Sequence, residues 1–144
     1  MSGPTEGIYR LTNYTNRWTV ATKSHAGLAQ PGQIVMTFRD GEKIFPEHSV
    51  FTVCTNASGQ YSFQNPVTKM FIGCGEDEKG HPATAWTMTP QYWDVSPVGP
   101  GIWSISMADS YWDDCITDNK NAWAEILLRE EKELVQYFWL FVAA

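Results

Sequence analysis

Three segments of the chain begin in the same way, and this repeat limits the possible folds more than any other feature. Each starts with a glycine followed by large apolar residues at the second and fourth positions after it, as in Gly7-Ile8-Tyr9-Arg10-Leu11, Gly59-Gln60-Tyr61-Ser62-Phe63 and Gly101-Ile102-Trp103-Ser104-Ile105. Such alternation is typical of a half-buried strand. Eleven positions after each glycine stands another large residue, Trp18, Met70 or Trp112, which predicts a second strand with equivalent positions in the three segments.

Each repeat also closes in a similar way, with the patterns Phe51-Thr52-Val53, Trp93-Asp94-Val95 and Phe138-Trp139-Leu140. Apolar segments at 34–38, 85–88 and 125–128 predict a third strand before each closing strand. The length of 144 residues suits a single domain. We therefore expect one domain over residues 1–144, built from four-stranded repeats at about 7–56, 57–99 and 100–144.

Four strands cannot bury their apolar face alone, so the three units are expected to close around a common axis. The first and fourth strands would form a barrel and the middle pairs a cap of hairpins, which is the all-β, twelve-stranded β-trefoil. A two-sheet sandwich also fits short strands at this spacing, but it does not explain a threefold repeat. Alternation along the last strand would leave Trp139 pointing outward. The expected core consists of Tyr9, Leu11, Phe51, Val53, Tyr61, Phe63, Trp93, Val95, Trp103, Ile105, Phe138 and Leu140.

One stretch has two interpretations. Between Asn121 and Val135, apolar spacing, a Glu125–Arg129 pair at i,i+4 and many Glu and Lys residues favour a helix. The repeat instead predicts strands at 124–129 and 135–141, and tertiary context often overrides local propensity. We prefer the strands.

Composition limits the partners and the compartment. Sixteen Asp and Glu against ten Lys and Arg give a net charge of −6, which disfavours nucleic acid and anionic membranes as partners. No apolar stretch approaches the ~20 residues of a membrane-spanning helix, and the first residues do not resemble a secretory signal. We expect a cytoplasmic protein. The three cysteines, Cys54, Cys74 and Cys115, lie in no C-x-x-C pattern and are expected to be free thiols.

The sequence offers little support for catalysis. It lacks the nucleophile elbow, metalloprotease helix, phosphate loop and dinucleotide-binding turn. His25, His48 and His81 are scattered over expected loops. We therefore expect no enzyme and no cofactor. The acidic cluster of Asp109, Asp113, Asp114 and Asp118 lacks the spacing of a calcium loop, and we expect no metal site.

The first candidate function is protease inhibition. A long connection between the second and third strands contains Thr22, Lys23, Ser24 and His25. A trypsin-like protease binds a basic side chain in a pocket with a buried carboxylate, so Lys23 could enter that pocket. A loop held by a rigid barrel loses little entropy on binding. The structural alternative is that Lys23 is an ordinary solubilising charge.

The second candidate function is carbohydrate binding. Trp112 could stack on a pyranose ring, while carboxylates and amides nearby could bind its hydroxyl groups. The polar residues proposed for this site are Asp113, Asp114, Asn119 and Asn121. The alternative is that Trp112 packs in the core, because it is equivalent in the repeat to Trp18 and Met70.

The opening Gly7-Ile8-Tyr9-Arg10-Leu11-Thr12-Asn13 and the closing Tyr137-Phe138-Trp139-Leu140 resemble the small cytosolic β-trefoil proteins of mushrooms, in particular the trypsin-inhibitor family of cospin and cnispin. That resemblance implies an inhibitory Lys or Arg in an exposed loop. The loop between the second and third strands holds Lys23. The loop between the last two strands holds Arg129 and Lys132 among glutamates, which would repel the carboxylate of a trypsin pocket.

Two related families remain alternatives. Gln91-Tyr92-Trp93 and Gln136-Tyr137-Phe138 are similar to the Gln-x-Trp repeats of ricin-B-like lectins, whereas Ser49-Val50-Phe51 departs from that pattern. The first repeat also resembles the start of the mycocypins, which inhibit cysteine proteases. We expect an inhibitor of trypsin-like serine proteases that serves fungal defence, with a glycan-binding lectin or a mycocypin-type inhibitor as alternatives.

Overall fold

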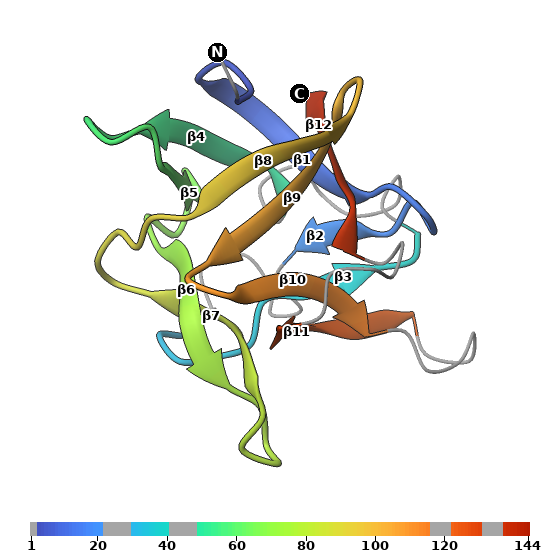
Figure 1. Cartoon of the computed structure of the whole chain (residues 1–144). Helices are drawn as coiled ribbons and strands as arrows, with labels where there is room; N and C mark the ends of the chain where they lie inside the picture. The colour runs from blue at the N-terminus through green and yellow to red at the C-terminus, as the bar shows by residue number, and fades with distance from the viewer. Residues whose placement is uncertain (1–2, 22–29, 41–48, 116–121, 131–136) are drawn as a thin grey trace.

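The computed structural model describes residues 3–21, 30–40, 49–115, 122–130 and 137–144. These residues form twelve β-strands in three successive units of four (Figure 1). The first unit contains β1 (Gly7–Asn13), β2 (Thr19–Ala21), β3 (Met36–Phe38) and β4 (Phe51–Thr55). The second contains β5 (Tyr61–Gln64), β6 (Phe71–Glu76), β7 (Pro82–Thr87) and β8 (Asp94–Gly99). The third contains β9 (Ile102–Met107), β10 (Ser110–Cys115), β11 (Trp123–Arg129) and β12 (Trp139–Ala143).

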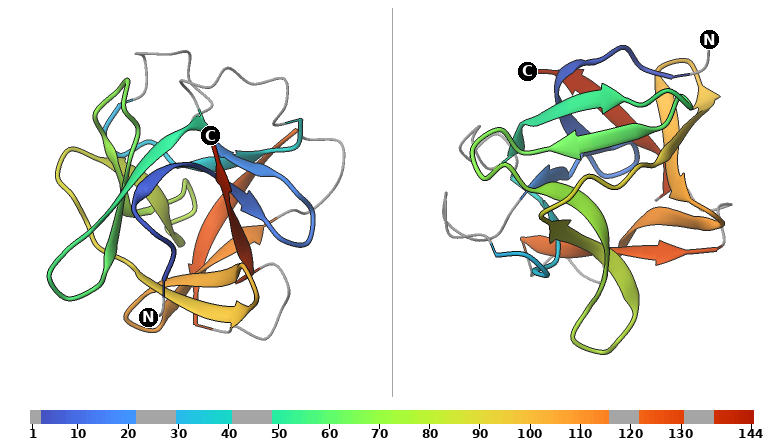
Figure 2. Two further views of the ribbon diagram at one scale, coloured as in Figure 1. Left: turned by 90° about the horizontal axis from the view of Figure 1, so that it is seen from above. Right: turned by 90° about the vertical axis from the view of Figure 1, so that its left-hand side faces the viewer.

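Six of these strands close into a barrel (Figure 2). β1 pairs with β4 and β12, β9 pairs with β8 and β12, and β4 pairs with β5, all antiparallel. A bridge between Tyr61 of β5 and Trp93, the residue before β8, joins β5 to β8. The first and fourth strands of each unit therefore surround one axis, as the repeat predicts.

The middle strands of each unit form the hairpins β2–β3, β6–β7 and β10–β11. β11 pairs with both β3 and β7, and a bridge between Ile34 and Ala85 joins the first hairpin to the second. The three hairpins therefore cover one end of the barrel. The strand predicted in place of a helix is confirmed over Trp123–Arg129.

The core fills the inside of the barrel and the base of the cap. Eight of the expected core residues are buried in one cluster, and Tyr9 and Trp103 pack against it while partly exposed. The eight are Leu11, Phe51, Val53, Tyr61, Phe63, Trp93, Val95 and Ile105. Burial of side chains of this size contributes about 1.5–3 kcal/mol each.

The prediction of which residues of the last strand face the core was wrong, because the alternation is displaced by one residue. Trp139 is fully buried, whereas Phe138 and Leu140 are only half-buried. The residue two positions after each repeat glycine pairs with the first core residue of a closing strand, in the pairs Tyr9–Phe51, Tyr61–Trp93 and Trp103–Trp139. Trp139 is therefore the counterpart of Phe51 and Trp93. A slip of one residue exchanges the two faces of a strand.

The equivalence of Trp112 with Trp18 and Met70 was also wrong. The strand pairs Thr12–Thr19, Gln64–Phe71 and Ser106–Tyr111 occupy the same place in the three units, so the third hairpin is shorter by two residues. Trp112 is then the counterpart of Val20 and Ile72. Two indole hydrogen bonds agree with this register, since Nε1 of Trp93 donates to the carbonyl of Ile72 and Nε1 of Trp139 to that of Trp112.

The shorter turn has a local cause. In the first two units a buried asparagine holds a four-residue loop, because Oδ1 of Asn13 accepts the N–H of Thr15 and Oδ1 of Asn65 accepts the N–H of Val67. Met107 takes that place in the third unit and cannot accept such bonds in the same way. The chain turns there within two residues, with Ala108 at φ 53°.

Two further expectations concern the cysteines and membrane-spanning helices. Cys54 and Cys74 are free thiols, as expected, and the structure shows both to be exposed. Within the described residues, no helix has the length and apolar character needed to cross a membrane.

Candidate functional site

The outer face of the β10–β11 hairpin carries an ion pair. Nε of Arg129 lies 3.0 Å from Oδ2 of Asp113. Tyr111 lies opposite Arg129 in the antiparallel ladder, so these two side chains share a face. Asp113 stands two residues after Tyr111 on β10 and therefore points to that same face. The Asp113 side chain is 8% exposed and that of Arg129 49%. The pair therefore places a guanidinium at the surface and a carboxylate beneath it.

Burial determines the electrostatics of this pair. It raises the pKa of Asp113, and the charge of Arg129 opposes that rise. A carboxylate that is mostly buried depends on such a partner to stay ionised. Arg129 therefore belongs to the structure of the site as well as to its surface.

Two tyrosine rings lie beside the ion pair. The rings of Tyr111 and Tyr137 have centroids 6.2 Å apart and an interplanar angle of 2°. This parallel stack connects β10 to the segment that leads into β12. It thereby fixes one wall of the site.

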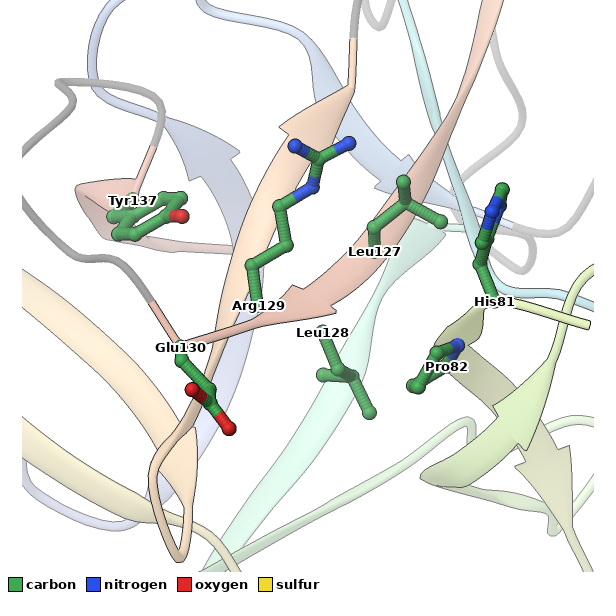
Figure 3. A pocket seen from close by; sticks show the side chains of 7 residues that line it. All are labelled: His81, Pro82, Leu127, Leu128, Arg129, Glu130 and Tyr137. Carbon is green, nitrogen blue, oxygen red and sulfur yellow. The ribbon is translucent and has the colours of Figure 1, made fainter.

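A pocket of about 410 Å³ opens here (Figure 3). The end of β11 and Tyr137 come from the third unit, and the start of β7 comes from the second. Arg129 stands between Tyr137 and Leu127 in this view. Pockets of this size, with apolar walls and a few polar groups, suit small organic ligands. The lining residues are His81, Pro82, Leu127, Leu128, Arg129, Glu130 and Tyr137.

The sequence matches no protein-family profile and no curated protein. Solved structures do match the fold. The Rhizoctonia solani agglutinin has a TM-score of 0.77 at 15% identity, over 99% of this chain and 98% of the agglutinin. The Macrolepiota procera ricin B-like lectin, in complex with lactose, has a TM-score of 0.76 at 8% identity over 100% of both chains.

The fold is a β-trefoil. A mosquitocidal holotoxin also matches, with a TM-score of 0.81 at 14% identity, over 99% of this chain but 18% of the toxin. The trefoil thus spans less than one fifth of that protein. At these identities the similarity concerns the fold alone.

The three trefoil units differ at the positions of the site. The hairpin register places Ala21, Gly73 and Asp113 at one equivalent position, and Phe38, Thr87 and Arg129 at a second. The closing strands place Ser49, Gln91 and Tyr137 at a third, two positions before Phe51, Trp93 and Trp139. In the second unit the Gln91 amide occupies the space, because Oε1 accepts the N–H of Cys74 and a Cβ on Gly73 would lie 2.6 Å from Cδ of Gln91. At the first two of these positions the third unit has an aspartate and an arginine, whereas the first and second units have uncharged residues.

The structure changes the roles of two residues proposed for carbohydrate binding. Trp112 is 0% exposed, so it belongs to the core and cannot present a face to a sugar. Asp114 is 1% exposed and points to the opposite face from Asp113. It accepts hydrogen bonds from the Thr37 hydroxyl at 2.7 Å and from Nδ2 of Asn16 at 3.1 Å. Asp114 therefore ties three strands or loops of the trefoil together.

Burial raises the pKa of Asp114 to about 6. The hydrogen bonds from Thr37 and Asn16 act in the opposite direction, and the nearby charge of Asp113 adds to the rise. Asp114 thus links the stability of the trefoil to pH.

Several proposed residues lie outside the described part of the chain. They are Thr22, Lys23, Ser24 and His25 of the first protease-binding loop, Lys132 of the second, and Asn119 and Asn121 of the carbohydrate site. Arg129, the described residue of the second loop, is tied to Asp113 at the end of β11. Protease binding through Lys23 stays a prediction.

Sequence reasoning missed His81 and Tyr137 as site residues. Tyr137 belongs to the Gln136-Tyr137-Phe138 pattern, but the register makes Tyr137, two positions before Trp139, the counterpart of Gln91. His81 comes from another unit, and nothing in the local sequence signals its place. Among the residues with described positions, no group of three or more His, Cys, Asp or Glu could hold a metal ion.

Proposed function

We propose that this protein binds glycans through the pocket on the outer face of its third unit. The pocket beside the Asp113–Arg129 pair carries this proposal. Sugars present hydroxyl groups and patches of C–H, and the pocket offers both kinds of partner. Arg129 donates hydrogen bonds, Glu130 accepts them, and Pro82 and Leu127 supply apolar contact.

The structural neighbours support this class of ligand. One is an agglutinin, one was solved with lactose, and a third, SeviL, was solved with the asialo-GM1 saccharide. The net charge of −6 disfavours acidic glycans. We therefore expect a neutral glycan. The trefoil would present one such site, because the Asp113–Arg129 pair occurs in the third unit. The equivalent residues are Ala21 and Phe38 in the first unit and Gly73 and Thr87 in the second.

The substitution Arg129→Lys tests the site. Lysine keeps the positive charge but lacks the planar fork that pairs with Asp113 and with two ligand oxygens at once. We expect binding to the strongest glycan of a printed array to fall about tenfold or more, as lost charge-assisted hydrogen bonds would cause. Thermal unfolding of the variant checks that the trefoil remains folded.

Arg39→Lys is the matched control. Arg39 also pairs with an aspartate, Asp40, at 3.2 Å, but it does not line the pocket. Its substitution should leave glycan binding unchanged. Equal binding by the Arg129→Lys variant and the wild type would exclude the pocket as the site, and the absence of any bound glycan on the array for the wild type would refute the function.

A further inference from the structure

The pocket belongs to two trefoil units at once. Figure 3 shows His81 and Pro82 on one side and Arg129 and Tyr137 on the other, with Leu127 and Leu128 between them. His81 and Pro82 lie where the β6–β7 hairpin enters β7, and β7 pairs with β11 through Ala83 and Leu127. The two walls are therefore held by a sheet contact between neighbouring hairpins.

The pocket is larger than a single sugar requires. Pockets of roughly 300–1,000 Å³ bury ligands of drug size, and a pyranose, with about a dozen heavy atoms, is smaller than such a ligand. The volume of this pocket is about 410 Å³. Room therefore remains beside a sugar that contacts Arg129.

His81 is oriented for a polar contact. Its Nδ1 lies 3.3 Å from Oδ2 of Asp77, whose side chain is 4% exposed. The backbone N–H groups of Lys79 and His81 donate to Oδ1 of the same carboxylate at 2.9 and 2.8 Å. Burial favours the protonated form of Asp77, but these hydrogen bonds outweigh it and lower the pKa. An ionised Asp77 only accepts, so Nδ1 carries the hydrogen of this contact. In the neutral imidazole, Nε2 is then the acceptor available to a ligand hydroxyl.

We propose that the pocket holds two consecutive sugar residues, the first beside Arg129 and Tyr137 and the second beside His81 and Pro82. This inference rests on the proposed function. The ligand is then a disaccharide or a longer neutral glycan, and His81 determines which second sugar and which linkage are accepted. A hydroxyl group of the second sugar donates to Nε2 of His81, and its C–H face contacts Pro82.

The substitution His81→Ala tests this assignment. Binding is measured on a glycan array that carries each neutral monosaccharide beside the di- and trisaccharides that end in it. We expect binding of the oligosaccharides to fall about tenfold while binding of the corresponding monosaccharide changes less than about twofold. Lys79→Ala is the control, because Lys79 lies on the same hairpin and does not line the pocket.

Each result decides the matter. A selective loss for oligosaccharides, absent in the Lys79→Ala variant, supports a second sugar at His81. Unchanged binding of all glycans, or an equal loss for mono- and oligosaccharides, overturns the inference and leaves the proposed function in place. A wild-type protein that binds no glycan on the array overturns both.

Discussion

Replacement of Trp112 with alanine is expected to lower the free energy of unfolding by about 3–5 kcal/mol. Trp112 is fully buried, and its ring lies 5.4 Å from those of Phe63 and Trp93 and 5.7 Å from that of Trp139. Removal of the indole would leave a cavity in the middle of this aromatic cluster. Chemical denaturation measured by tryptophan fluorescence and by circular dichroism gives the change.

Tyr92→Ala provides the control for this experiment. Tyr92 is aromatic but 36% exposed, so we expect its loss to cost less than about 1 kcal/mol. A Trp112→Ala variant that keeps the stability of the wild type and loses glycan binding would restore Trp112 as a sugar platform. That result would contradict the register derived for the third hairpin.

The second large effect concerns pH. Asp114 has an ordinary pKa of 3.8, which burial raises to about 6 in the folded protein. The folded protein therefore holds this proton more tightly than the unfolded chain does. The stability that Asp114 contributes is fully present below about pH 4 and is lost as the pH rises through about 6. A shift of about two units corresponds to about 3 kcal/mol.

Asp114→Asn should therefore flatten the dependence of unfolding free energy on pH between about pH 4 and 7. Thr37→Val should do the opposite, because it removes a hydroxyl hydrogen bond that lowers the Asp114 pKa. Denaturant titrations at several pH values give the unfolding free energy of each variant, and hence its slope against pH. Identical slopes for Asp114→Asn and the wild type would show that Asp114 does not carry this dependence.

The barrel could be predicted from the sequence because most of its strands carry a strong alternation of apolar and polar residues. The glycine repeats at 7, 59 and 101 marked the starts of the units. A strand at 124–129 was predicted against local helix propensity from the repeat alone, and it is observed as β11. Burial on one side of each strand imposes this pattern on the sequence.

Register was harder to predict than strand position. The segment Phe138-Trp139-Leu140 contains three large apolar residues in a row, so alternation could not show which one faces the core. The shorter turn at Ala108 shifted Trp112 by two residues without changing its distance from the glycine. Strand pairing across the sheet decides both cases, and that pairing is not a local property of the sequence.

The candidate site was predicted only in part. Asp113 was among the proposed carbohydrate ligands, and Arg129 was assigned to protease binding instead. Their ion pair depends on the β10–β11 register. His81 reaches the pocket from a different unit, through the pairing of β7 with β11. Such a site arises from contacts between units, which sequence motifs do not record.

The most direct test of glycan binding at the third unit is to map the binding residues by nuclear magnetic resonance. Labelled protein would be titrated with the strongest neutral glycan from the array. We predict that the backbone amide signals of His81, Tyr137 and residues 127–130 change most, with one glycan bound per chain. The largest changes at Phe38 or Gln91, in the equivalent positions of the other units, or more than one glycan per chain, would contradict a single site on the third unit.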